Sequence, residues 1–155
     1  MTSRLPAASY QKTKGEGNKR LLKKMVAANE YLGVIAYTGK EPIAWCSVSP
    51  KERLLQQKNS RLLRLTENTD TWSIVCLFIL PAWRRKGVSS IIIEGAYQYA
   101  ISKGARIVEA YPVIPRNDKM PDVFAWTGIW KSYQKAGFII AGNPSESKYI
   151  MQRKE

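Results

Sequence analysis

Three cations and a glycine follow one another in the sequence, at Arg84-Arg85-Lys86-Gly87. An apolar run at residues 71–80 precedes them, and a helix-forming stretch comes after. A buried strand that leads directly into a helix leaves unsatisfied backbone N–H groups and partial positive charge at the junction. Glycine also lets the backbone approach an anion without a Cβ in the way. Such a turn suits a pyrophosphate, and a solvated charge cluster on an ordinary strand–helix turn is the alternative.

The charge balance of the whole chain also indicates anionic partners. The 155 residues include 25 Lys and Arg against 12 Asp and Glu, which gives a net charge of +13. This excess predicts contact with cofactor phosphates, nucleic acid or a membrane surface. No apolar segment is long enough to span a bilayer as a helix. The longest apolar stretch contains Pro81 and is about half the ~20 residues needed. We therefore expect a cytoplasmic protein without membrane contact.

Two residue types narrow the possible chemistry. The chain has no His, which excludes Ser-His-Asp and Cys-His catalysis and removes the usual zinc ligand. Cys46 and Cys76 both lie in apolar runs that are typical of strands. We expect them to be buried free thiols in a reducing compartment, and we expect no metal.

The elements that must position the basic turn follow from the periodicity and the turn residues. Residues 1–17 are polar and basic, and we expect them to be loose, with residues 18–155 forming one domain. In the first half of the domain we expect a helix over 18–29 capped by Asn18, strands over 31–38 and 42–49, and a long connection over 51–70. A strand over 71–80 then leads through the basic turn into a helix that ends at about Lys103, and a strand follows over 107–111. The chain ends with a helix from Asp122 to Ala136 and a hairpin of 138–141 and 149–151, with its turn at 142–144. This order predicts an α/β domain with a mixed sheet.

The basic turn resembles the acyl-CoA-binding motif of the GNAT family of N-acetyltransferases, in which an apolar strand and Pro precede Gln or Arg-x-x-Gly-x-Gly or Ala. Residues 84–89 fit this pattern with Ser89 in the place of the last small residue. The run from Tyr133 to Phe138 resembles the family's Tyr-x-x-x-Gly-Phe, which ends the last helix. Residues 14–18, 45–48 and 124–128 are similar to a poorly characterised bacterial branch of the family.

This resemblance implies a mostly antiparallel sheet flanked by helices, with a splayed central strand pair and without the family's usual first strand and helix. It implies acetyl transfer from acetyl-CoA to a primary amine of a small molecule or peptide, by direct attack in a ternary complex, and a homodimer is compatible with it. The cofactor would pair with backbone groups of one strand and place its pyrophosphate on the basic turn. The residues implied for these contacts are Leu77, Phe78, Ile79, Arg84, Arg85, Lys86, Gly87, Val88, Ser89 and Ser90.

Catalytic roles follow from the same resemblance. It implies that Tyr133 is the acid that protonates the leaving thiolate. Many members carry a Glu base on the central strand, but residues 71–80 contain no carboxylate. Glu109 lies in the neighbouring strand, where burial would raise its pKa towards a useful range. A purely structural role for Glu109 is an equal alternative, and Asp70 and Asp122 are further candidates.

Three alternatives stay open at the level of sequence. Trp126 and Trp130 share helical spacing with Tyr133, so the three could line an acceptor pocket or pack in the core. The protein could bind acyl-CoA without catalysis, since the usual Glu is missing. A basic nucleic-acid-binding module ranks last, because no zinc pattern, aromatic RNA-binding strand or basic zipper occurs.

Overall fold

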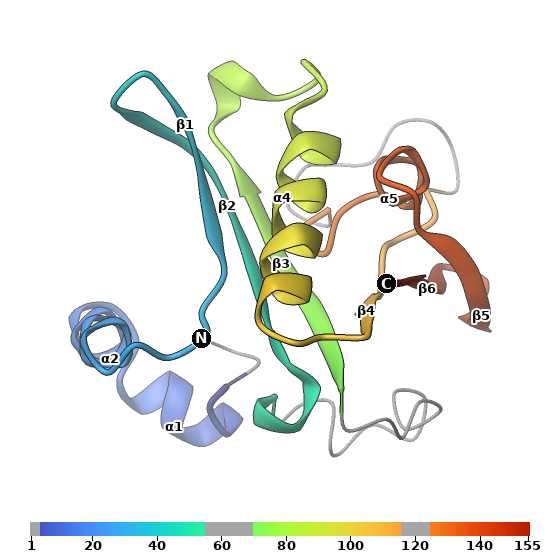
Figure 1. The fold of residues 1–155 in the computed structure, drawn as a ribbon. Coiled ribbons are helices and arrows are strands. Elements are labelled where there is room, and N and C mark those ends of the chain that lie inside the picture. Colours follow the sequence, from blue (N-terminus) through green and yellow to red (C-terminus); the bar gives the residue numbers. More distant parts are fainter. Residues whose placement is uncertain (1–3, 55–69, 116–124) are drawn as a thin grey trace.

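The computed structural model describes residues 4–54, 70–115 and 125–155 (Figure 1). Its elements, in chain order, are α1 (Ala7–Lys12), α2 (Glu16–Ala27), β1 (Val34–Thr38), β2 (Glu41–Pro50), the short 3₁₀ helix η1 (Lys51–Arg53), β3 (Thr71–Ile79), the 3₁₀ helix η3 (Pro81–Trp83), α4 (Val88–Ser102), β4 (Ile107–Ala110), α5 (Trp130–Lys135), β5 (Ile139–Ser145) and β6 (Lys148–Lys154).

The six strands form one sheet in the order β1-β2-β3-β4-β6-β5. Every neighbouring pair is antiparallel except β3 and β4, which are parallel. The central strands are rich in β-branched and aromatic residues, which suit a pleated surface. This arrangement confirms the predicted mixed, mostly antiparallel sheet flanked by helices.

The two central strands separate after a β-bulge. Ser47 on β2 lies opposite Cys76, whereas the next residue, Val48, lies opposite Ile74, so one residue of β3 is left without a partner. A bulge of this kind bends the strand and increases its twist. β4 pairs with β3 only as far as Ile74, although β3 continues to Ile79. The end of β3 is therefore free of β4, as expected for a splayed strand pair.

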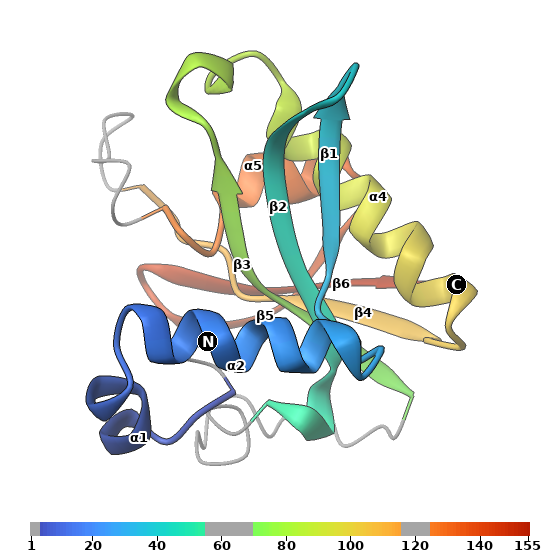
Figure 2. The ribbon, with the colours of Figure 1, turned by 90° about the vertical axis from the view of Figure 1, so that its left-hand side faces the viewer.

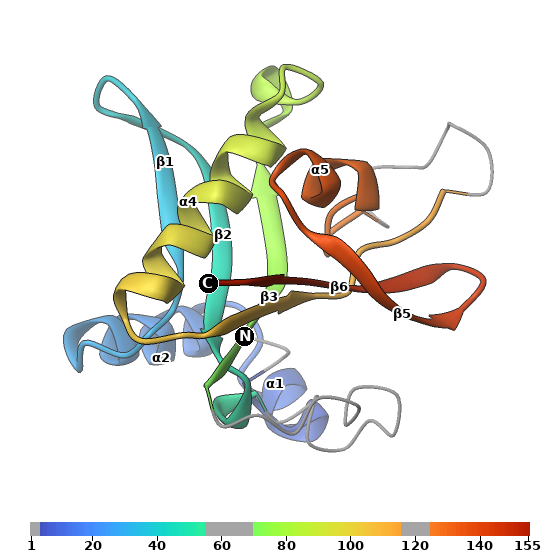
Figure 3. The same ribbon diagram turned by 45° about the vertical axis from the view of Figure 1, so that its right-hand side comes forward.

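Helix α4 covers one face of the sheet and supplies much of the core. Its buried residues include Ile92, Ile93 and Ala96, which cluster with Val48 and Ile74 of the sheet. Figure 3 shows α4 and α5 in front of the sheet, while α1 and α2 lie behind its lower part. Among the described residues, no helix is long and apolar enough to cross a membrane.

The N-terminal segment is helical, so the prediction of a loose segment over residues 1–17 is wrong from Ala7 onward. Asn18 does not cap a helix, because it lies inside α2. Its side chain instead donates to the Tyr10 carbonyl at 3.2 Å and accepts from the Thr13 hydroxyl at 2.5 Å. These bonds fix the corner between α1 and α2, and Figure 2 shows α2 lying crosswise to β1, β2 and β3 with α1 at its start. A helix thus precedes α2, and no strand occurs in residues 4–33.

The last helix is shorter than predicted. Residues 125–129 form turns and an isolated bridge, and α5 begins only at Trp130. Asp122 lies outside the described residues. The predicted shared face of Trp126 and Trp130 is therefore wrong: Trp126 is half exposed in a turn, and Trp130 packs edge-on against Tyr149. The final hairpin also turns later than predicted, at residues 146–147.

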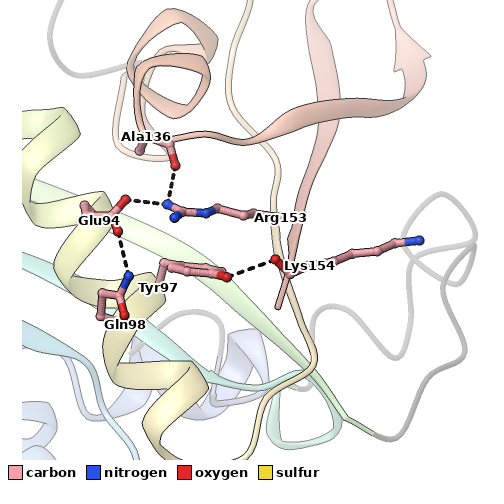
Figure 4. A network of polar contacts seen from close by, with 6 residues as sticks. All are labelled: Glu94, Tyr97, Gln98, Ala136, Arg153 and Lys154. Atoms are coloured by element: carbon pink, nitrogen blue, oxygen red, sulfur yellow. Dashed lines mark hydrogen bonds and ion pairs between the residues drawn. The ribbon is translucent and has the colours of Figure 1, made fainter.

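One side chain of β6 ties α4 and α5 to the sheet (Figure 4). The guanidinium of Arg153 stacks 3.8 Å from the ring centre of Tyr97, donates to the Ala136 carbonyl at 2.7 Å and pairs with Glu94. The Tyr97 hydroxyl donates to the Lys154 carbonyl at 2.9 Å. These contacts hold the end of α5, and with it Tyr133, in a fixed position relative to α4.

Candidate active site

The strand–helix junction has an open geometry at its glycine. Gly87 is the N-cap of the 15-residue helix α4, with a left-handed φ of 81°, and a Cβ added there would meet nothing within 4 Å. No side chain caps α4, and no acidic residue lies in its first turn. Its first amides therefore point to an exposed surface without a carboxylate to neutralise them, and the junction fits an anionic group.

The three cations of the junction differ in their surroundings. Arg84 donates from Nε to the Ile79 carbonyl at 3.0 Å, and this bond holds its side chain against the last residue of β3. Lys86 is exposed, with its ammonium 5.4 Å from the centre of the Trp83 ring. Arg85 is exposed and has a φ of 58°, which is uncommon for a residue with a side chain. Positive charge therefore surrounds the N-terminus of α4.

The serines predicted at this junction already have intramolecular partners. The Ser89 hydroxyl lies 2.9 Å from the Ser132 hydroxyl, which joins the first turn of α4 to α5. The Ser90 hydroxyl donates to the Gly87 carbonyl at 2.9 Å. Val88 is buried in the core and can contribute only its backbone. The Ser89–Ser132 pair is a connection that the sequence does not reveal, because the two residues are 43 positions apart.

The free end of β3 is bordered by a later segment of the chain. The Leu77 N–H donates to the Trp126 carbonyl at 2.7 Å, and the Val113 N–H, beyond β4, donates to the Gly128 carbonyl at 3.0 Å. Residues 126–128 therefore bridge the gap between the separated strands. Phe78, on the opposite side of the strand from Leu77, is half exposed. A cofactor that pairs with Leu77 would have to replace the Trp126 carbonyl.

Tyr133 is fully buried beside this bridge. Its hydroxyl donates to the Thr127 carbonyl at 2.9 Å, and its ring packs edge-on against Phe138 at 5.4 Å. Burial, and to a smaller extent the nearby thiols of Cys46 and Cys76, raises the pKa of Tyr133 well above its ordinary value. The phenol is therefore protonated at neutral pH.

Glu109 is buried in the paired part of β4, where it faces three donors. Its carboxylate accepts from Lys51 Nζ at 2.8 Å, from Gln152 Nε2 at 2.7 Å and from the Tyr111 hydroxyl. It lies opposite Ser73 rather than beside the free end of β3. A structural role fits this environment, and Glu109 lies in the paired part of β4 rather than at the N-terminus of α4. Asp70 precedes β3 and lies 3.9 Å from the Arg106 guanidinium.

A metal site requires several ligating side chains gathered in one place. In residues 4–54, 70–115 and 125–155, no group of three or more His, Cys, Asp or Glu side chains gathers in a way that could hold an ion. Cys46 is buried, and burial raises the pKa of its thiol. Both cysteines of the chain are free, and we assign neither a role at the site.

A splayed strand pair, a basic glycine turn and a helix N-terminus lie together in this fold, as the resemblance to the GNAT family implies. The model of the acetyltransferase (GNAT) family matches residues 2–138, and the chain belongs to this family. No curated protein sequence matched the chain significantly.

Solved structures show the same fold at low sequence identity. PaiA N-acetyltransferase from Thermoplasma acidophilum, in complex with coenzyme A, is 15% identical with a TM-score of 0.57, over 94% of this chain and 74% of that one. Ribosomal-protein-alanine N-acetyltransferase from Brucella melitensis is 11% identical with a TM-score of 0.57, over 90% and 78%. Aminoglycoside acetyltransferase AAC(6')-Ib with coenzyme A and kanamycin is 14% identical with a TM-score of 0.57, over 84% and 70%.

Proposed function

We propose that this protein transfers an acetyl group from acetyl-CoA to a primary amine of a small molecule or peptide. The observation that carries the proposal is the junction at Gly87, where an uncapped helix N-terminus, an open glycine and three cations meet at the free end of β3. Family membership and neighbours that bind coenzyme A support it. We also propose that residues 18–155 act as one domain and that the protein is bacterial and cytoplasmic.

Different residues of this chain would bind the pyrophosphate and the pantetheine arm of acetyl-CoA. The amides at Val88, Ser89 and Ser90, with Arg84, Arg85 and Lys86, would hold the pyrophosphate. The backbone at Leu77, Phe78 and Ile79 would pair with the pantetheine arm, and the Leu77 N–H would exchange the Trp126 carbonyl for a cofactor oxygen. Acetyl-CoA supplies the activated thioester.

The chemistry requires one proton to leave the amine and one to reach the sulfur. The amine nitrogen attacks the thioester carbon directly, so a C–N bond forms and the C–S bond breaks. We assign protonation of the departing thiolate to Tyr133, which keeps its proton at neutral pH. Its hydroxyl must turn away from the Thr127 carbonyl to do so.

A base that takes up the amine proton must have a free carboxylate oxygen lone pair, and the Glu109 carboxylate already accepts from three donors. We retain Glu109 as the proposed base and Asp70 as its competitor. Glu109→Gln should flatten the acidic limb of the kcat/KM pH profile if Glu109 accepts the proton, whereas Asp70→Asn should leave that limb unchanged. The opposite result would assign the base to Asp70.

The direct test is to mix the protein with acetyl-CoA and a panel of amines and to follow the release of free thiol. The panel should include amino acids, polyamines, aminoglycosides and peptides with a free N-terminus. Buried Cys46 should add little background to a thiol reagent. Thiol release with at least one amine is the expected result. Tight binding of acetyl-CoA without thiol release for any amine would favour the alternative, a catalytically silent acyl-CoA-binding protein.

A further inference from the structure

The α1–α2 corner carries a concentrated positive charge that the acetyl-transfer site does not use. Six cations and one carboxylate lie between residues 12 and 24, a net charge of +5. The cations are Lys12, Lys14, Lys19, Arg20, Lys23 and Lys24, all of them exposed. The carboxylate, Glu16, pairs with Lys19 at 3.2 Å on the surface.

The cations of α2 share one side of the helix. At 100° per residue, Lys19, Arg20, Lys23 and Lys24 fall within an arc of roughly 140°, and neighbours three or four positions apart lie ~5–6 Å from one another. In the part of the chain that the structure describes, no carboxylate pairs with Arg20, Lys23 or Lys24. Arg20, Lys23 and Lys24 therefore form an uncompensated cationic strip that extends about 6 Å along the axis of α2.

Side-chain hydrogen bonds hold the corner together, although it contributes almost nothing to the core. α1 has no buried residue, and Asn18 is the single buried residue of α2. Hydrogen bonds among Tyr10, Thr13 and Asn18 nevertheless lock the two helices together. Figure 2 shows α2 at the outside of the molecule, crosswise to β1, β2 and β3. A helix fixed in this way presents its cations at constant spacing.

We propose that the cationic strip of α2 docks the protein non-specifically on the phosphate backbone of nucleic acid. Charge complementarity supports this partner, because a duplex offers one negative charge per ~1.7 Å of its axis. An anionic membrane fits less well. The apolar residues Leu21, Leu22 and Met25 are half-buried on the inward side of α2, whereas a membrane-binding helix turns its apolar side outward.

The test compares two triple variants that remove the same charge. One is Arg20→Gln, Lys23→Gln and Lys24→Gln, in which Gln keeps the helix propensity of the strip. The matched control is Lys40→Gln, Lys135→Gln and Lys148→Gln, three exposed lysines outside both the strip and the junction at Gly87. Fluorescence polarisation of a short labelled DNA duplex, between about 50 and 200 mM salt, gives the affinity and its salt dependence.

The strip variant should bind the duplex at least tenfold more weakly at low salt, and its log–log salt slope should be shallower by about 3. The control should change much less. Equal losses in both variants, or no duplex binding by the unaltered protein, would overturn the proposal. Binding to phosphatidylserine vesicles that depends on the strip, without duplex binding, would assign the strip to membranes instead. Acetyl-CoA affinity should stay unchanged in both variants, so failure here leaves the proposed transferase activity standing.

Discussion

At the scale of single residues, the position of Tyr133 makes a specific prediction about catalysis. Tyr133→Phe keeps the ring and its packing on Phe138 but removes the proton donor. If the hydroxyl protonates the thiolate, kcat should fall by ~10²-fold or more, while acetyl-CoA affinity should barely change. Steady-state kinetics and calorimetry measure the two quantities separately.

Tyr97→Phe is the matched control, because the Tyr97 hydroxyl also donates to a backbone carbonyl at 2.9 Å but lies outside the site. Both variants should lose a similar ~1 kcal/mol of stability from the missing hydrogen bond. A Tyr133→Phe enzyme with near-normal kcat would show that Tyr133 is a packing residue and that water or substrate protonates the sulfur.

Buried tyrosines also predict how stability depends on alkaline pH. Burial raises the pKa of Tyr133 and, together with the adjacent Glu109, raises the pKa of Tyr111. A raised folded-state pKa stabilises the fold fully below the unfolded value of ~10, and this stabilisation is lost as pH rises above it. Each group should lower the free energy of unfolding by about 1.4 kcal/mol per pH unit there.

Urea unfolding between pH 9 and about 11 tests this dependence. Tyr133→Phe should remove one group's share of the slope, whereas Tyr99→Phe, which changes a tyrosine of α4 that is only partly buried, should remove less. An identical slope in the unaltered protein and the Tyr133→Phe variant would contradict the burial of Tyr133.

At the scale of elements, the turn before α5 controls where Tyr133 lies. Gly128 has a φ of 81°, and a Cβ there would approach Tyr133 Cε2 to 2.7 Å. Gly128→Ala combines backbone strain with a clash against a buried ring, and we expect it to destabilise the fold by roughly 2–4 kcal/mol. Gly104→Ala shares the strain, with a φ of 90°, but a Cβ there meets open space.

Urea unfolding of the two variants should therefore show a clearly larger loss for Gly128→Ala. Equal losses would mean that Tyr133 moves aside at little cost, and the ring would then not be fixed beside the bridge between β3 and the chain beyond β4.

The same turn shows what sequence reasoning can and cannot detect. Strands such as β3 and the helix α4 follow from long apolar runs and a clear glycine stop, so their predicted bounds agree with the structure within a residue or two. The spacing of Trp126, Trp130 and Tyr133 suggested one long helix, but the left-handed Gly128 ends that continuity. The side-chain bonds that form the α1–α2 corner leave no periodic signal at all.

The candidate site was predictable to a different extent. The basic turn around Gly87 is local in sequence, so its motif locates the helix N-terminus directly. Contacts between distant segments were not predictable, among them the Trp126 carbonyl on Leu77 and the three donors on Glu109. The apolar residues around Glu109 predict its burial, but only the folded structure shows that Lys51 and Gln152 reach it.

At the scale of the whole molecule, the sheet, the bulge in β3 and the helix α4 together shape the junction at Gly87. They lead from the end of β3 that is not paired with β4 to the uncapped N-terminus of α4 at Gly87. The central claim is that the phosphates of acetyl-CoA bind there, and it can be tested by a change of a single charge.

The measurement is the calorimetric affinity for acetyl-CoA of Gly87→Asp against Gly87→Asn. The two side chains have nearly the same shape, both tolerate a left-handed φ and cap helices well, and open space surrounds this position, so both variants should fold. The carboxylate alone repels phosphate, so the Asp variant should bind at least tenfold more weakly than the Asn variant, a difference of ~1.4 kcal/mol or more. Equal affinities in the two folded variants would contradict a pyrophosphate site at the N-terminus of α4.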